Sequence, residues 1–231
     1  MTKPNRLYVT ILGVLILQAC DSAKLGARNE ANPSGAAAQF APPVRLVTSA
    51  TGAVTERSGP ISWNAQSSQF EFSGKPIKIS RQWNFTNNPG DFTIGGALAG
   101  PADGSGLAVT ESGVDTAIRS AGGLNLDGGR DALIIVRLTR VRAGERWDGS
   151  LFYTTSDHRE SEKYKGKAPK AANPGLNETV TLVYDMHKLR RGADDWKMSR
   201  IDQFRLDLDD GPGGAFILRQ IAIAERPPGY P

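Results

Sequence analysis

Arginine and aspartate alternate with large apolar residues near the carboxyl end of the chain. Within "IDQFRLDLDD", an apolar residue at every second position separates Arg205, Asp207 and Asp209. A strand with this alternation buries one face and presents the other. The polar face could bind sugar hydroxyls through a guanidinium and a carboxylate, could hold a metal through its carboxylates, or could simply face water.

Sugar recognition needs an aromatic ring face together with polar groups that bind adjacent hydroxyls. In "DALIIVRLTRV", Arg137 lies opposite the apolar series, as Arg205 and Asp207 do in theirs. If these faces form one concave surface, Trp147 or Tyr153 could be the platform, which gives five candidate carbohydrate-binding residues: Arg137, Trp147, Tyr153, Arg205 and Asp207. The alternative is a same-face ion pair of Arg205 and Asp207 that only solvates the sheet. Trp83 and Trp196 are expected in the core.

The acidic run before Gly-Pro-Gly-Gly raises a metal alternative. Asp207, Asp209 and Asp210 offer the oxygen ligands that calcium prefers. Their spacing is not that of an EF-hand loop, and aspartate before glycine is typical of a turn. We therefore expect a turn and no cofactor, with calcium at these three residues as the weaker alternative.

Catalysis has little support in the sequence. His158 and His187 are the only histidines, both in polar segments, and no Gly-x-Ser-x-Gly element is present. Two distant histidines and one cysteine disfavour zinc. No pair of carboxylates is singled out for glycoside hydrolysis, whose geometry is three-dimensional. We expect a protein without enzymatic activity.

The amino terminus has the pattern of a secretory signal. Lys3 and Arg6 precede an apolar run over residues 7–17 that ends at the single cysteine, Cys20. The run is shorter than the ~20 residues that span a bilayer. Residues 17–20, Leu-Gln-Ala-Cys, resemble the lipobox of bacterial lipoproteins, which implies cleavage before Cys20 and its acylation, including palmitate. The alternative is an ordinary signal peptide with an incidental cysteine.

The lipobox resemblance places the protein in a bacterial cell envelope, anchored in the membrane through Cys20 and facing the periplasm. Asp21 resembles the residue that retains lipoproteins at the inner membrane in enteric bacteria. Removal of residues 1–19 lowers the formal net charge from +4 to +2. No polybasic cluster remains, which argues against a nucleic-acid partner.

The mature chain divides into a linker and one domain. Residues 20–59 are rich in Ala, Gly, Ser, Pro and Asn, predict a flexible tether, and contain "VRLVTSA" as a possible edge strand. Residues 60–226 show repeated two-residue alternation bounded by turn signals, which predicts an all-β fold, an antiparallel β-sandwich or barrel, followed by a tail at 227–231. The charged segment from His158, "HRESEKYKGKAPKAANPG", is expected to form the rim of any site.

Several segments in order resemble the carbohydrate-binding-module-like, galactose-binding-like jelly rolls of bacteria. They are "QWNFTNNPGDFTIG", "GLAVTESGVDTAIRSAGGLNLDGGRDALIIVRLTRV", "GSLFYTTSDH" and "WKMSRIDQFRLDLDDGPGGAFILRQIAIA". The resemblance implies a jelly-roll β-sandwich that binds a polysaccharide or another envelope glycan. Because a sandwich supports many functions, two alternatives stay open: a structural or assembly subunit that contacts a protein partner in an envelope or export complex, and a polysaccharide-active enzyme.

Overall fold

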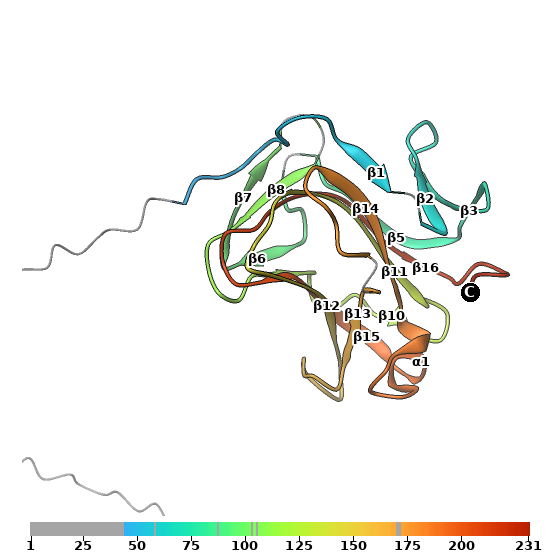
Figure 1. The fold of residues 1–231 in the computed structure, drawn as a ribbon. Helices are drawn as coiled ribbons and strands as arrows, with labels where there is room; N and C mark the ends of the chain where they lie inside the picture. Colours follow the sequence, from blue (N-terminus) through green and yellow to red (C-terminus); the bar gives the residue numbers. More distant parts are fainter. Residues whose placement is uncertain (1–43, 58, 87, 103, 105, 170–171) are drawn as a thin grey trace, which may run out of the picture. The chain divides into compact units, whose positions relative to one another are not determined.

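A computed structural model describes residues 44–231 apart from 58, 87, 103, 105, 170 and 171. The predicted signal peptide, the lipidation site at Cys20 and most of the predicted linker lie outside the described residues. Within the described part, strands dominate and the helices are single turns (Figure 1). None of the described helices is long and apolar enough to cross a membrane.

The larger of the two main layers is a seven-stranded sheet in the order β1-β14-β11-β16-β8-β7, with β5 also paired to β16. All of its pairings are antiparallel except that of β1 with β14. Its strands are β1 (Thr55–Arg57), β5 (Ile79–Asn84), β7 (Ala97–Pro101), β8 (Leu107–Glu111), β11 (Leu133–Arg142), β14 (Glu178–Asp185) and β16 (Ala215–Ala224).

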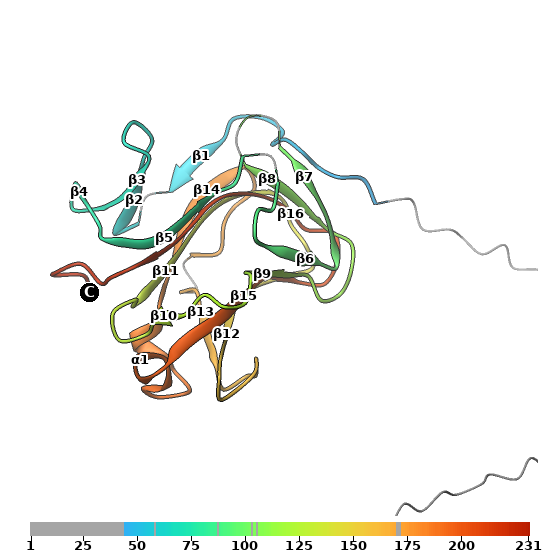
Figure 2. The same ribbon diagram turned by 180° about the vertical axis from the view of Figure 1, so that it is seen from behind.

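The second layer is a six-stranded antiparallel sheet in the order β13-β12-β15-β9-β6, with β10 also paired to β15. Its strands are β6 (Thr93–Gly95), β9 (Ala117–Arg119), β10 (Leu126–Asp127), β12 (Arg146–Thr155), β13 (Lys165–Lys167) and β15 (Arg200–Asp210). The 3-10 turn η2 (Met186–Lys188) and the helix α1 (Asp195–Met198) lie on the connection from β14 to β15. Figure 2 shows the two layers from behind.

The chain alternates between the two sheets. β8, β11, β14 and β16 belong to the seven-stranded sheet, and β9, β12 and β15, which come between them in sequence, belong to the other. Strands that cross in this way from sheet to sheet are the pattern of a jelly roll. The predicted all-β jelly-roll sandwich is therefore confirmed.

A small three-stranded sheet adds a second apolar contact. Its strands, in the order β2-β3-β4, are β2 (Ile61–Asn64), β3 (Gln69–Phe72) and β4 (Lys75–Pro76). Ile61 and Phe70 are fully buried and form a cluster with Leu133 and Ile135 of β11. β11 thus buries both of its faces, which explains why "LIIV" is apolar without a break.

The main core lies between the two large sheets. The alternating residues Phe204, Leu206 and Leu208 of β15 point into it and are at most 1% exposed. The predicted core position of Trp196 is confirmed, since it is fully buried and its indole N–H donates to the carbonyl of Asp131 at 2.9 Å. Trp83 is half-buried and packs against the same core.

The folded unit extends beyond the predicted 60–226 at both ends. β1 pairs with β14, and the amide of Val47 donates to Thr110 Oγ1 at 2.8 Å. The segment "VRLVTSA" forms no strand, although Leu46 and Val47 pack against a small apolar cluster. In the predicted tail, Tyr230 packs edge-on against Phe72 with ring centroids 5.6 Å apart. At both ends, a few residues outside the predicted range pack against the domain and extend it.

Candidate functional site

The outward face of the six-stranded sheet carries a row of side chains in register across five strands. Thr93 pairs with Arg119, Arg119 with Arg205, Arg205 with Phe152, and Phe152 with Lys165. Because Arg205 lies between core residues on β15, its side chain and those paired with it face away from the core. At ~4.8 Å between strands, this cross-strand row spans about 19 Å.

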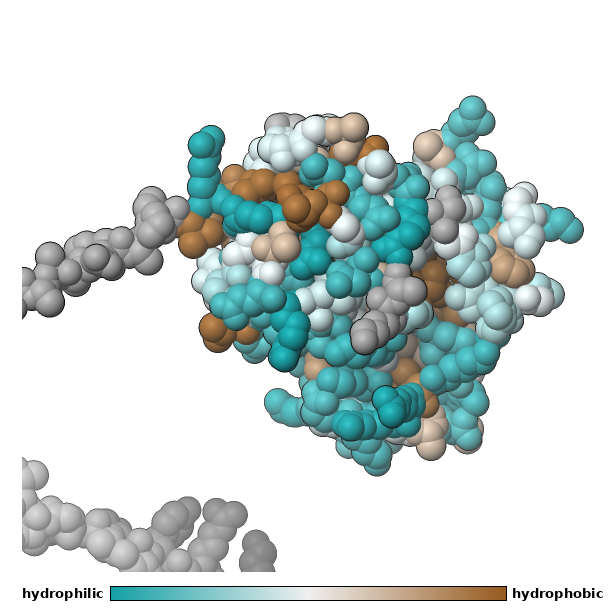
Figure 3. All heavy atoms as spheres, in the orientation of Figure 1, coloured by the Kyte–Doolittle hydropathy of each residue, from teal (hydrophilic) through white to brown (hydrophobic). Residues whose placement is uncertain are grey.

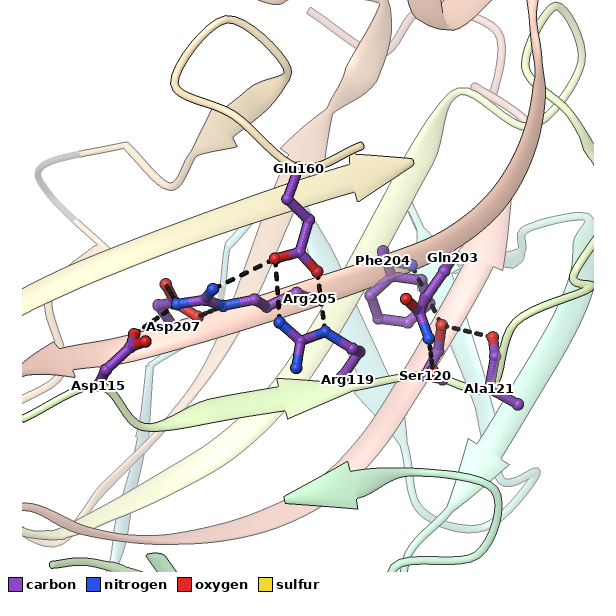
Figure 4. Close-up of polar contacts among 9 residues, drawn as sticks. All are labelled: Asp115, Arg119, Ser120, Ala121, Glu160, Gln203, Phe204, Arg205 and Asp207. Carbon is purple, nitrogen blue, oxygen red and sulfur yellow. Dashed lines mark hydrogen bonds and ion pairs between the residues drawn. The ribbon is translucent and has the colours of Figure 1, made fainter. Parts of the chain in front are cut away.

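Arg205 is the centre of an ion-pair network on this face (Figure 4). It binds Asp207 through Nε–Oδ1 and Nη2–Oδ2 contacts of 2.6 and 2.7 Å, Asp115 at 2.6 Å and Glu160 at 3.2 Å. Glu160 also accepts from Arg119 Nε and Nη2 at 2.8 and 3.0 Å. The loop that carries Glu160 is thereby fixed over β9 and β15.

Burial and these ion pairs together shift the pKa values of the network residues. Burial alone would lower the pKa of Arg205, but the hydrogen bond and charge of Asp207, with Asp115 and Glu160, raise it overall. Burial raises the pKa of Asp207 even though Arg205 opposes that shift. The hydrogen bond from Arg119 lowers the pKa of Glu160. The guanidinium therefore remains a fixed positive charge in the middle of the face.

A polar cleft of about 870 Å³ lies beside the network. β9, β12 and β15 contribute Arg119, Thr154, Thr155, Asp202 and Gln203 to it, and the loop at residues 156–160 contributes the rest. Gln203 Nε2 donates to the Ser120 carbonyl at 2.7 Å, which fixes the amide and leaves its carbonyl oxygen for other partners. Within the described part of the chain, the Thr154 hydroxyl and the Arg159 guanidinium form no hydrogen bond.

The loop wall of the cleft is held by His158. Its Nε2 lies 2.9 Å from Asp195 Oδ2, the same oxygen that accepts from the Tyr153 hydroxyl at 2.9 Å. Its Nδ1 lies 3.1 Å from the Arg159 carbonyl oxygen, and its ring stacks on Tyr164 at 3.4 Å. Because both ring nitrogens are engaged, His158 holds the loop and is not placed as a general base for a nucleophile.

The structure separates the predicted sugar-binding residues. Arg137 lies on β11 of the other sheet, where it forms an ion pair with Glu56 at 2.8 Å and covers the Trp63 ring at 5.9 Å. It therefore shares no surface with Arg205, and the prediction of one concave face containing both is wrong. Arg205 and Asp207 do share a face, as the ion pair that the alternative interpretation described.

Neither predicted aromatic platform belongs to the cross-strand row. Tyr153 points into the core and is fully buried, because its position on β12 pairs with Phe204. Trp147 packs against Phe216 at the core, with Arg140 5.6 Å from its ring. The prediction of an open ring is wrong for Tyr153, whereas Trp147 is half-buried and stays a prediction. Sequence alternation alone does not show that β12 has a bulge between Trp147 and Ser150, which shifts its register.

Sequence reasoning missed Phe152, which lies in the cross-strand row. Its ring is covered by Arg205 at 5.3 Å and by Lys165 at 5.1 Å. The signal was present in "GSLFYTTS", where Phe152 alternates with Leu151 and Tyr153. Arg119 and Glu160 were also missed, because apart from Asp207 the partners of Arg205 come from segments 45 to 90 residues away in the chain.

The three aspartates of the calcium alternative do not converge. Asp207 binds Arg205, Asp209 binds Arg140 at 2.9 and 3.1 Å, and Asp210 pairs with Arg146. No group of three metal-ligating side chains occurs among the described residues. Each carboxylate has a different arginine as its partner, and residues after Asp210 form the expected turn.

Neither the protein-family models nor the curated proteins contain a match to this chain. Three similar solved structures are a family 29 carbohydrate-binding module complexed with cellulohexaose, a family 29 module from Piromyces equi, and CBM86, a low-affinity xylan-binding module from Roseburia intestinalis. Their sequence identities are 13%, 12% and 9%, with TM-scores of 0.40, 0.41 and 0.39. The alignments cover 63%, 63% and 64% of this chain and 92%, 91% and 97% of the others. At these values the similarity assigns no function, and the site is argued from its own geometry.

Proposed function

We propose that this protein is a bacterial envelope lipoprotein, anchored through Cys20, whose sandwich domain binds a polysaccharide or another envelope glycan without catalysis. The observation that carries the binding role is the polar cleft of about 870 Å³ beside the cross-strand row. The sequence of residues 1–20 supports the anchor.

The lining of the cleft suits sugar hydroxyls. Thr154 supplies a hydroxyl that can both donate and accept, Gln203 supplies a fixed carbonyl oxygen, and Arg159 supplies guanidinium donors. A ligand on this face would be bound mainly by hydrogen bonds, because Phe152 is covered by cations. Thr154 lies on a strand and the Gln203 amide is fixed by a hydrogen bond, so these two groups lose little conformational entropy when they bind a ligand.

The test is glycan binding by the full chain, purified in a detergent that contains no sugar. Thr154→Val and Arg159→Ala remove groups that form no hydrogen bond within the described chain, so both variants should stay folded. We expect saturable binding of at least one polysaccharide by the natural chain and a several-fold weaker affinity in each variant. Arg137→Ala, on the opposite sheet, is the matched control and should bind like the natural chain.

Two results would contradict the proposal. Binding that is lost in Arg137→Ala but kept in the cleft variants would move the site to the other sheet. The second result is that the folded natural chain binds no neutral or acidic polysaccharide but captures another protein in a fixed ratio. That result would favour an assembly subunit.

A further inference from the structure

A second, strongly basic pocket lies where the edge of the six-stranded sheet meets the other layer. It has a volume of about 370 Å³ and is formed by β13, the end of β14, and the segment from η2 to residue 191. This volume lies within the range of small-ligand pockets. Five cations line it: Lys165, Lys167, Lys188, Arg190 and Arg191.

Acidic side chains account for three of the five cations. Lys167 pairs with Asp148 at 2.6 Å. Glu162 is shared by Lys165 at 2.7 Å and Arg191 at 3.7 Å. Asp185 is already bound by Arg226 at 2.5 Å and by the amide of His187 at 3.2 Å. Glu162 therefore pairs with two cations of the pocket, and Asp185 pairs with an arginine outside it, so neither carboxylate is left for the other cations.

Lys188 and Arg190 are the cations left over. Both are exposed, and neither forms an ion pair or hydrogen bond with any residue in the described part of the chain. Two guanidinium or ammonium groups beside one recess attract an anion more strongly than either does alone. In Figure 3 the lower part of the domain is mostly hydrophilic on the face shown.

The cross-strand row connects the basic pocket with the polar cleft, which Arg119 lines at the other side of the row. Lys165 lines the pocket and is also the last member of the cross-strand row, where it covers Phe152 at 5.1 Å. β13 is an edge strand of the six-stranded sheet. A glycan chain that lies along the row would therefore reach the pocket beyond β13. A polymer is thus a better match than an isolated small anion.

From this juxtaposition we infer that the glycan is acidic and that the pocket between β13 and the η2 segment binds a carboxylate of one of its uronic-acid residues through Lys188 and Arg190. This inference rests on the proposed function. A recessed pocket fits a sugar ring with its carboxylate better than it fits the flat surface of a bilayer.

The experiment compares polygalacturonate and alginate with their carboxyl-reduced forms, which have the same linkages without the charge. With the full chain in sugar-free detergent, we expect at least tenfold tighter binding of the acidic polymers. Lys188→Ala and Arg190→Ala should each abolish most of that preference while leaving binding of the reduced polymers unchanged. Lys75→Ala removes an exposed cation from the three-stranded sheet and is the charge-matched control.

The outcomes separate the two proposals. Equal binding of acidic and reduced polymers would overturn the acidic specificity and leave the glycan-binding role intact, whereas no binding of either would overturn both. Binding to anionic phosphatidylglycerol vesicles that is lost in Lys188→Ala, with no preference between the polymers, would overturn the inference in favour of a membrane surface. A preference that survives in both variants would place the acidic subsite elsewhere.

Discussion

Arg205 and Asp207 form a bidentate ion pair between two side chains of the same strand face, with nitrogen–oxygen distances of 2.6 and 2.7 Å. The two side chains are only 16% and 13% exposed, so the pair is mostly shielded from water. The hydrogen bonds between the two side chains form without a ligand. A glycan on this face would meet a fixed platform of charges, and Arg205 acts first as a positioning residue for Glu160.

Arg205→Met should destabilise the fold. The change leaves Asp207, Asp115 and Glu160 without their common cation, and we expect a loss of roughly 1–3 kcal/mol in the free energy of unfolding, less than for a fully buried pair. Urea unfolding measures it. A double-mutant cycle with Asp207→Asn should show a coupling energy of the two changes; independent, additive effects would contradict the role of the pair. Arg205 is therefore a poor single test of ligand binding.

Glu111 should make the stability of the domain depend on pH. It is 1% exposed, and burial followed by the charge of Asp209 raises its pKa from 4.5 to about 8, although Arg140 opposes the shift. Its Oε2 has no hydrogen-bond partner in the described chain. The folded state therefore binds the proton more tightly than the unfolded state does. The contribution of Glu111 is fully present below pH 4.5 and is lost as the pH rises through about 8.

Comparison of the natural chain with Glu111→Gln isolates this contribution. Between pH 4.5 and 8 the unfolding free energy of the natural chain should fall relative to that of the variant, by at most ~1.4 kcal/mol per pH unit. Parallel pH profiles of the two proteins would show that Glu111 is ionised in the folded state. Carboxyls that do not interact with Glu111 contribute to both profiles and cancel in the difference, whereas Asp209, which is coupled to Glu111, is part of the measured contribution.

The sequence indicated the layers of this fold much better than its site. Alternation identifies the buried residues of β15, such as Phe204 and Leu206, because a strand has a period of two whatever it packs against. It could not show that Arg137 and Arg205 lie on opposite sheets, because sheet membership depends on which distant strands pair. The unbroken "LIIV" of β11 indicates burial on both faces, unlike the alternation in β15, but it does not identify the sheet to which the strand belongs.

The partners of Arg205 were beyond sequence reasoning for the same reason. Asp207 is two residues away and was named, whereas Glu160 comes from a loop folded back over β9. Tyr153 was predicted as a possible aromatic platform, yet its ring is buried and its hydroxyl donates to Asp195. Aromatic residues of this type are buried when a partner for the polar atom is available.

Gly214→Ala should destabilise the end of the sandwich that contains Glu111. A methyl group at Gly214 would collide with Glu111 Oε2 and lie 2.6 Å from Asp209 Oδ2. Both side chains are buried, and Arg140 binds Asp209. We expect a loss of ~1–3 kcal/mol in the unfolding free energy, which thermal or urea unfolding would detect. Gly95→Ala is the control, because a methyl group there meets nothing within 4 Å. Equal stability of the two variants would show that the carboxylates move aside.

His158 should determine whether the loop stays closed against the sheet. The ring joins Asp195, which is 2.9 Å away on α1, to Tyr164, on which it stacks. His158→Ala removes both contacts, and we expect several-fold faster trypsin cleavage after Arg159 and Lys163, with little change in global unfolding because the core is untouched. Asp195→Ala should have a similar effect, since it removes the acceptor of both His158 and Tyr153.

Asp194→Ala is the matched control for these loop variants. Asp194 is adjacent to Asp195 but pairs with Lys197 on the exposed side of α1, at 2.6 Å. Cleavage should therefore proceed at the natural rate in Asp194→Ala. If His158→Ala were also cleaved at the natural rate, the ion pair of Glu160 with Arg119 and Arg205 would have to hold the loop by itself. Glu160→Gln in the His158→Ala background would then be expected to release it, because the substitution removes the negative charge that attracts both arginines.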